Sequence, residues 1–288
     1  MAIRTPGAVV LAPSVGSRTG RTFRPAVYLS ALFLALVVAA AIAPAAFTSA
    51  SPLDTDVADP LRGPSGSHLL GTDASGRDIY TRVVFGARSS LAIGVGATAL
   101  ALLVAVALGL AAGLGGPRLD GAINRFLEVL FAFPGLLIAL LFIAMFGPGV
   151  TTEIVAVAIG AAPGYARMVR GQVLAVKGSG YVAAASALGH APRRVVAQHV
   201  FPNAMRPLVV LATMGVGQSI VWASSLSFLG LGVAPPAPEW GAMLDAGRDF
   251  VSTAWWLELF PGLAIVGCTL SVTVVGRYLQ QRLEGTLA

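Results

Sequence analysis

Few residues of this 288-residue chain have side chains suited to catalysis or metal binding. Among them are the only cysteine, Cys268, the only lysine, Lys177, and three histidines, His68, His190 and His199. No glycine precedes Lys177, so the chain lacks the G-x-x-x-x-G-K-[ST] loop that cradles nucleotide phosphates. The H-E-x-x-H and G-x-S-x-G motifs are absent as well. The sequence therefore predicts a protein without a catalytic site and without a bound cofactor or metal.

One grouping of polar residues leaves a metal site open as an alternative. His68 lies close in sequence to Asp73 and Asp78, and imidazole and carboxylate groups are common metal ligands. These residues fall in a Gly- and Pro-rich stretch, so solvated loop residues are the simpler interpretation.

Composition places the chain among integral membrane proteins. It is 56% hydrophobic and 11% charged, with a mean hydropathy of +0.80, whereas soluble domains carry about 25% charged residues. The net charge of +6 is explained more simply by membrane topology and anionic lipid than by nucleic acid.

Six apolar blocks are long enough to cross a bilayer core of about 30 Å as helices. They span approximately residues 26–47, 90–114, 123–146, 154–173, 208–231 and 255–275. We therefore predict an all-α protein with six transmembrane helices, the last five forming a core over residues 90–276. The first block also resembles a signal peptide, but its apolar run exceeds the usual 7–15 residues, so we expect it to be retained.

Charge asymmetry orients these helices. With a cytoplasmic N-terminus, the inside segments hold 14 of the 19 basic residues and 3 of the 13 acidic ones. This bias follows the positive-inside rule and predicts that both termini are cytoplasmic, as tails of residues 1–25 and 277–288. Residues 48–89 then form an outside loop, in which residues 76–91 are expected to form an amphipathic helix on the membrane surface. The polar connector at residues 171–207 falls in the cytoplasm.

Residues 174–206 of this connector, the coupling segment below, have the features of a short exposed helix. Ser179 is placed to cap its start, the alanines that follow favour helix, and Gly189 can end it in a left-handed conformation. Pro192 prevents simple continuation, and Arg193 and Arg194 supply positive charge. From residue types alone, docking of a partner and a loop lying on the membrane remain equally open.

The spacing within this segment resembles the coupling motif of bacterial ABC importer permeases. The motif has Glu-Ala-Ala, then Gly, then Ile and Leu-Pro; here the corresponding residues are Ala183-Ala184-Ala185, Gly189, His199 and Phe201-Pro202. Further stretches over about residues 67–276 resemble the second permease subunit of the dipeptide/oligopeptide/nickel family. They are Gly71-Thr-Asp-Ala-Ser-Gly-Arg-Asp78, Gly86-Ala-Arg-Ser-Ser-Leu91, Phe133-Pro134, Tyr165-Ala-Arg-Met-Val-Arg-Gly171, His199-Val-Phe-Pro-Asn203, Leu226-Ser-Phe-Leu-Gly-Leu-Gly232, Glu239-Trp-Gly241 and Phe260-Pro-Gly262.

The resemblance implies a type I ABC importer permease in the bacterial cytoplasmic membrane. It implies a second homologous permease subunit, two cytoplasmic ATPase subunits that bind ATP and Mg²⁺, an extracytoplasmic substrate-binding protein and surrounding lipid as partners. The solute would be a peptide, with a nickel chelate or haem also open. A stand-alone secondary transporter or channel is the alternative, disfavoured because the span centres are almost free of ionisable residues.

The resemblance also assigns roles to residues. ATPase coupling is expected at Tyr181, Val182, Ala183, Ala184, Ala185, Leu188, Gly189, His190, Pro192 and Arg193. Support of the coupling segment is expected from Arg167, Arg170, His199, Pro202 and Asn203. Contact with the binding protein is expected at Gly71, Thr72, Asp73, Gly76, Arg77, Asp78, Glu239 and Trp240. One departure concerns Ala183, because the family has glutamate there; docking is therefore expected to be weaker or differently supported.

Overall fold

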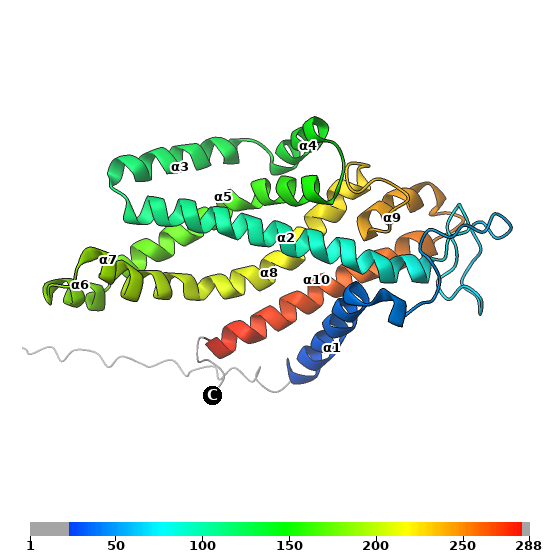
Figure 1. Cartoon of the computed structure of the whole chain (residues 1–288), viewed down its shortest axis with the longest axis horizontal. Helices are drawn as coiled ribbons and strands as arrows, with labels where there is room; N and C mark the ends of the chain where they lie inside the picture. Colours follow the sequence, from blue (N-terminus) through cyan, green and yellow to red (C-terminus); the bar gives the residue numbers. More distant parts are fainter. Residues whose placement is uncertain (1–22, 284–288) are drawn as a thin grey trace, which may run out of the picture.

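The computed structural model describes residues 23–283 and is built almost entirely of helices (Figure 1). The long helices are α1 (Phe23–Ile42), α2 (Ile79–Leu114), α3 (Pro117–Ala132), α4 (Gly135–Phe146), α5 (Val150–Lys177), α8 (Phe201–Phe228) and α10 (Trp256–Leu283). The shorter elements are η2 (Pro44–Ala46), α6 (Gly180–Ala187), α7 (Pro192–Val195), the π-helical turn η3 (Val196–Val200), α9 (Trp240–Gly247) and η4 (Arg248–Phe250). Of the expected tails, residues 1–22 and 284–288 lie outside the described residues, whereas residues 23–25 belong to α1 and residues 277–283 to α10.

The described helices account for part of the expected set of six spans. Four of them, α1, α2, α8 and α10, are long and apolar enough to cross a membrane, with α7 and η3 continuing into α8. The pair α3 and α4 would make a fifth span if it crosses as one bent unit. Helix α5, which contains the expected fourth span, is not among them; it carries Glu153, Arg167 and Arg170.

The third expected span, residues 123–146, is not one continuous helix. α3 and α4 meet at an angle of 84°. The break falls at Phe133, whose φ of −93° and ψ of 135° are extended, directly before Pro134. Proline disfavours the helical conformation of the residue before it, so Phe133-Pro134 ends α3 and redirects the chain.

The outside amphipathic helix expected at residues 76–91 is also not separate. Instead, α2 runs without interruption for 36 residues, from Ile79 to Leu114. Its N-cap is Asp78, whose side chain accepts a hydrogen bond from the Thr81 backbone N–H. No proline lies within this helix, and glycine alone is tolerated inside helices at modest cost, so nothing separates its polar start from its apolar remainder.

A line of small residues on α2 brings it close to neighbouring helices. These residues recur every fourth position and are buried: Ala97, Ala101, Ala105, Gly109 and Gly113. A Cβ at Gly109 would lie 2.6 Å from Val169 Cβ and 2.9 Å from the Ala166 carbonyl oxygen on α5. Small side chains at such a contact allow helix backbones to pack closely within membranes. The α2–α5 contact therefore depends on these positions lacking bulk.

The two groups of predicted contact residues lie at opposite ends of this elongated helical assembly. Helices α6 and α7 lie at one end, whereas the loop before α2 and helix α9 lie at the other (Figure 1). Helices α2, α5, α8 and α10 run between the ends. This separation matches the opposite sides assigned to them from charge.

Candidate functional site

Helix α6, in the coupling segment, rests on the bundle by one narrow apolar face. Val182 and Ala185 are buried and belong to the same apolar cluster as Val169 and Val173 of α5. They are three residues apart and therefore lie on one side of the helix. The remaining face is exposed, including Tyr181, Ala183, Ala184 and Leu188, with Leu188 78% exposed. The segment thus presents small side chains and two large ones, Tyr181 and Leu188, outward.

The end of α6 has the left-handed glycine predicted for it. Gly189 has φ +81°, its N–H donates to the Ser186 carbonyl oxygen, and the His190 N–H donates to the Ala185 carbonyl oxygen. These two bonds make a Schellman motif, in which glycine avoids the steric cost of a left-handed residue. A Cβ at Gly189 would meet nothing within 4 Å. Its backbone conformation, rather than crowding within this chain, therefore favours glycine.

The start of α6 differs from the predicted cap. Ser179 does occupy the N-cap position, but its side chain makes no capping hydrogen bond. Its hydroxyl instead donates to the Val176 carbonyl oxygen at 2.5 Å. This bond ties the turn between α5 and α6 to the end of α5, which has unpaired carbonyl groups available.

Aromatic rings connect the two halves of the coupling segment. The His190 and His199 rings stack with centroids 6.1 Å apart, and Tyr181 meets His199 edge-on at 6.5 Å. Asn203, also predicted as support, donates from Nδ2 to the His199 carbonyl oxygen at 2.6 Å. Tyr181 lies before the Gly189 turn, and His190, His199 and Asn203 lie after it, so their contacts fix α6 against the start of α8.

A π-helical turn joins α7 to α8. Pro192 begins α7, where a missing N–H costs no intrahelical bond, and the Phe201 N–H bonds to the Val196 carbonyl oxygen, five residues back. Pro202 follows this turn, and a proline ring clashes with the carbonyl group four residues earlier in an α-helix. The wider turn precedes the proline without breaking the helix. Arg193 and Arg194 of α7 are exposed.

Two of the predicted supporting arginines hold α5 against α3. The Arg170 guanidinium donates to both carboxylate oxygens of Asp120, at 2.5 and 2.6 Å. The Arg167 guanidinium lies 4.2 Å from the centre of the Phe131 ring, within cation–π range. Both arginines therefore reach α3 rather than α6, and they support the coupling segment only through α5.

The predicted outer loop, residues 71–78, is an ordered turn. Asp73 Oδ1 accepts the backbone N–H groups of Ser75 and Arg77, and Thr72 pairs with Asp78 in a single bridge. Thr72 is fully buried, and its carbonyl oxygen accepts from Trp256 Nε1 at 3.0 Å. Gly71 and Gly76 are buried as well, with φ of +82° and +75°. Of the predicted contact residues in this turn, only Asp73, Arg77 and Asp78 keep partly exposed side chains.

The structure does not support direct binding-protein contact by Glu239 and Trp240. Each is only 1% exposed. Glu239 caps α9 by accepting the Gly241 and Ala242 N–H groups, and it also accepts the Ser90 hydroxyl at 2.8 Å. Trp240 Nε1 donates to the Val83 carbonyl oxygen at 2.9 Å. Their role in this structure is to dock α9 against α2, because buried polar groups require such partners.

The metal alternative has no support in the described part of the chain. His68 Nδ1 lies 3.1 Å from Asp78 Oδ1, while Asp78 Oδ2 accepts the Thr81 N–H. Within residues 23–283, no group of three or more His, Cys, Asp or Glu side chains is arranged to hold a metal ion.

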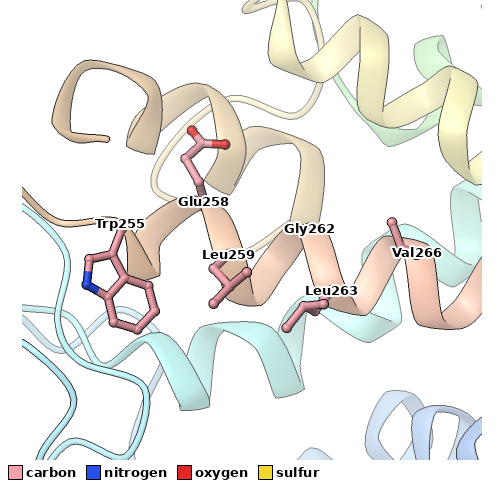
Figure 2. A pocket seen from close by; sticks show the side chains of 6 residues that line it. All are labelled: Trp255, Glu258, Leu259, Gly262, Leu263 and Val266. Carbon is pink, nitrogen blue, oxygen red and sulfur yellow. The ribbon is translucent and has the colours of Figure 1, made fainter. Parts of the chain in front are cut away.

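Two shallow apolar grooves run beside α10. The first, of about 440 Å³, is lined mainly by Trp255, Leu259, Leu263 and Val266. Figure 2 shows Glu258 pointing to the opposite side of α10 from Leu259 and Leu263. The second, of about 460 Å³, lies against α8 and shares Gly262 and Val266 with the first. The two grooves form one open apolar face on α8 and α10.

Several polar contacts escaped the sequence reasoning because their partners are far apart in the chain. Asp120 is 50 residues from Arg170, and Ser90 is 149 residues from Glu239. Glu153 is fully buried and accepts the Ser227 hydroxyl at 3.0 Å, 74 residues away. A charged residue in an apolar block signals that a partner exists, but not which one.

Comparisons with known proteins agree with this arrangement. Residues 105–285 match the family model of the binding-protein-dependent transport system inner membrane component. The dipeptide transport system permease protein DppC of Alkalihalophilus pseudofirmus is 39% identical, over 82% of this chain and 78% of its own length. The glutathione transport system permease protein GsiD of Pectobacterium atrosepticum is 41% identical, over 78% of this chain and 75% of its own length.

Solved structures show the same fold at lower sequence identity. An inward-facing structure of the MetNI methionine ABC transporter matches with a TM-score of 0.60 and 18% identity, covering 71% of this chain and 97% of that chain. The fold is thus that of an ABC transporter permease subunit. The chain belongs to the family of binding-protein-dependent transport system inner membrane components.

Proposed function

We propose that this chain is one permease subunit of an ATP-driven importer of peptides, set in the bacterial cytoplasmic membrane with both termini inside. The observation that carries the proposal is the exposed coupling segment at one end of the bundle, held by Val182 and Ala185 on one side and open on the other. Because the sequence has no phosphate-binding loop, ATP would have to be hydrolysed by another subunit. That subunit needs an exposed surface on this chain to which it can bind. ATP and Mg²⁺ would bind only to the partner subunits.

The proposed assembly contains a second homologous permease, two ATPases and an extracytoplasmic binding protein. The open face of α8 and α10 suits the second permease and the solute path better than lipid. The exposed side of α8 carries Gln218 and Ser225 among apolar residues, and polar side chains at membrane depth usually face protein or a water-filled path. A peptide is favoured as solute because the relatives named above are dipeptide and glutathione permeases.

The coupling role is tested by shortening the exposed side chain of Leu188. Burying a leucine in a partner surface is worth about 1.5–3 kcal/mol, so we expect Leu188→Ser to weaken ATPase association at least tenfold. The assay is co-purification of the ATPases with the tagged permease pair, followed by peptide-stimulated ATP hydrolysis in liposomes. Leu69→Ser is the matched control, because Leu69 is 62% exposed but precedes α2 at the opposite end.

Reconstitution separates this proposal from the stand-alone transporter. The complete assembly should accumulate a labelled dipeptide only with ATP and binding protein present, and this chain alone should move none. Uptake by the chain alone without ATP would refute the importer, and equal loss of ATPases from both leucine variants would refute the coupling assignment.

A further inference from the structure

A small cavity with unbalanced positive charge lies at the end of the molecule opposite the coupling segment. Its volume is about 100 Å³, and its walls come from the turn at residues 73–77, the start of α2, helix α9 and the start of α10. Its apolar walls are Ile79, Met243 and Leu257. Three charged side chains line it: Asp73, Arg77 and Arg82. Two cations therefore face a single carboxylate.

The carboxylate present does not satisfy either arginine. Asp73 Oδ2 is 3.7 Å from Arg77 Nη1 and 3.7 Å from Arg82 Nε, beyond hydrogen-bonding distance. Its other oxygen, Oδ1, is taken by the Ser75 and Arg77 backbone N–H groups. Asp78 is engaged with His68 and the Thr81 N–H, and Asp245 with Arg248. Glu258 Oε1 lies beside the lining residue Gly247 without a hydrogen-bond partner, but Glu258 pairs with neither arginine. Among the side chains that line the cavity, one positive charge therefore has no carboxylate of its own.

The two arginines differ in what they do within the chain. Arg82, with a side chain only 7% exposed, donates from Nη1 to the Pro52 and Pro236 carbonyl oxygens and so joins two loops. Arg77 is 20% exposed, and its buried Nε has no hydrogen-bond partner. Its guanidinium makes no hydrogen bond among the described residues, so Arg77 is the group free to bind a ligand.

We propose that this cavity receives a carboxylate side chain, Asp or Glu, from the binding protein when it docks on the outer end of the permease. The proposal rests on the function given above. A guanidinium matches a carboxylate with two parallel hydrogen bonds, and apolar walls strengthen that pairing. The cavity has room for one carboxylate group but not for the molecule that carries it.

The surrounding charge favours a docked side chain over a free anion. The segments assigned to the outside hold five arginines against ten acidic residues, a net charge of −5. This field repels dissolved anions, whereas a carboxylate fixed on a docked protein is carried in by the rest of the interface. The lining residues also include none of those along the α8–α10 grooves, so the cavity is separate from the proposed solute path.

Arg77→Gln tests the proposal in the complete purified assembly. Its side chain makes no hydrogen bond that the fold needs, so the variant should assemble and bind ATPases normally. Affinity for the binding protein should fall at least tenfold, and added salt should weaken binding less steeply than in the unchanged assembly. Arg248→Gln is the matched control, because Arg248 lies at the same end but pairs with Asp245. We expect its affinity to stay within twofold.

Charge reversal identifies which residue of the binding protein supplies the carboxylate. Arg77→Glu should abolish docking, and one Asp→Arg or Glu→Arg change on the binding protein should restore it. Unchanged affinity in Arg77→Gln, or failure of every reversal to restore docking, would overturn the proposal.

The Arg77→Gln variant, in the same assembly, also distinguishes a carboxylate of the transported peptide from one of the binding protein. If binding-protein affinity is unchanged while uptake of peptides with a free C-terminus falls relative to C-terminal amides, the cavity serves the solute and the proposal is wrong. Loss of ATPase association in the unchanged assembly would instead count against the importer itself.

Discussion

At the residue scale, Gly189 shows how backbone conformation limits the coupling segment. Its φ of +81° closes α6 and points Leu188 outward, while the space around it is empty. A left-handed conformation costs most L-residues about 1–2 kcal/mol, although asparagine adopts it more readily. Substitution there should therefore disturb the shape of the segment and leave the packed helices intact.

We predict that Gly189→Arg lowers ATPase association at least fivefold while the thermal unfolding temperature of the purified permease changes little. Gly189→Asn should retain most association, because it keeps the turn with a short side chain. Co-purification and thermal unfolding measure the two effects. Equal ATPase association of the unchanged permease, Gly189→Arg and Gly189→Asn would contradict the prediction. Equal loss of ATPase association in both variants would show that any side chain at this position blocks docking.

Ala183 supports a second prediction at this scale. It is exposed and is the fourth residue of α6, at the end of the first turn, where a negative charge interacts favourably with the helix dipole by about 0.3–1 kcal/mol. Ala183→Glu should keep transport or raise it up to about fivefold, whereas the uncharged Ala183→Gln should change it little. Peptide-stimulated ATP hydrolysis is the measurement. Complete loss of transport in the glutamate variant would show that the ATPase surface requires alanine.

At the element scale, the sequence predicts what local chemistry determines. Gly189 located the end of α6 correctly, and apolar length located α1, α2, α8 and α10. Pro192 was expected only to prevent continuation of the helix, whereas it begins α7. The sequence did not reveal that Phe133-Pro134 would bend its block by 84°, because proline is tolerated inside α5, α8 and α10. The outcome depends on whether neighbouring helices support a bend.

The same limit applies to the predicted contact residues. Glu239 and Trp240 were expected to contact the binding protein from an outer loop, yet both are buried. Glutamate is almost never fully buried unless it is paired. The partners that make burial of Glu239 and Trp240 favourable, Ser90 and the Val83 carbonyl group, are far away in the chain. Non-local pairing is therefore the part of the site that local patterns miss.

Close packing of α2 on α5 yields a prediction for Gly109. A Cβ there would overlap Val169, so Gly109→Ala should destabilise the permease by about 1–3 kcal/mol. Gly171→Ala on α5 is the control, because its Cβ would meet nothing within 4 Å and alanine favours helix. Unfolding in detergent followed by size-exclusion chromatography measures both. A Gly109→Ala protein as stable as the control would mean that the α2–α5 contact can relax.

At the scale of the whole molecule, the decisive feature is the separation of two surfaces with different chemistry. The coupling end lies in a stretch with no acidic residue from Ile154 to Pro238, whereas the opposite end carries most of the acidic residues. This asymmetry is visible in the sequence alone, because the positive-inside rule depends on the number of basic residues in each loop and not on tertiary contacts.

Cysteine labelling tests the orientation directly. The one native cysteine, Cys268, is fully buried, so the unchanged protein should give little background. In right-side-out vesicles, a membrane-impermeant maleimide should label Ala74→Cys at once and Leu188→Cys only after permeabilisation, since both positions are exposed. Labelling of Leu188→Cys in sealed vesicles would reverse the topology.

The π-helical turn at Val196–Val200 has a mechanical consequence. Because it widens the helix without interrupting it, α7, η3 and α8 form one rod of 37 residues from Pro192 to Phe228. At 1.5 Å per residue the rod is about 55 Å long, so a tilt of about 5° around its middle moves each tip by about 2.4 Å in opposite directions. A displacement of the helix at Arg193 would thus move its other end, at Phe228, in the opposite direction.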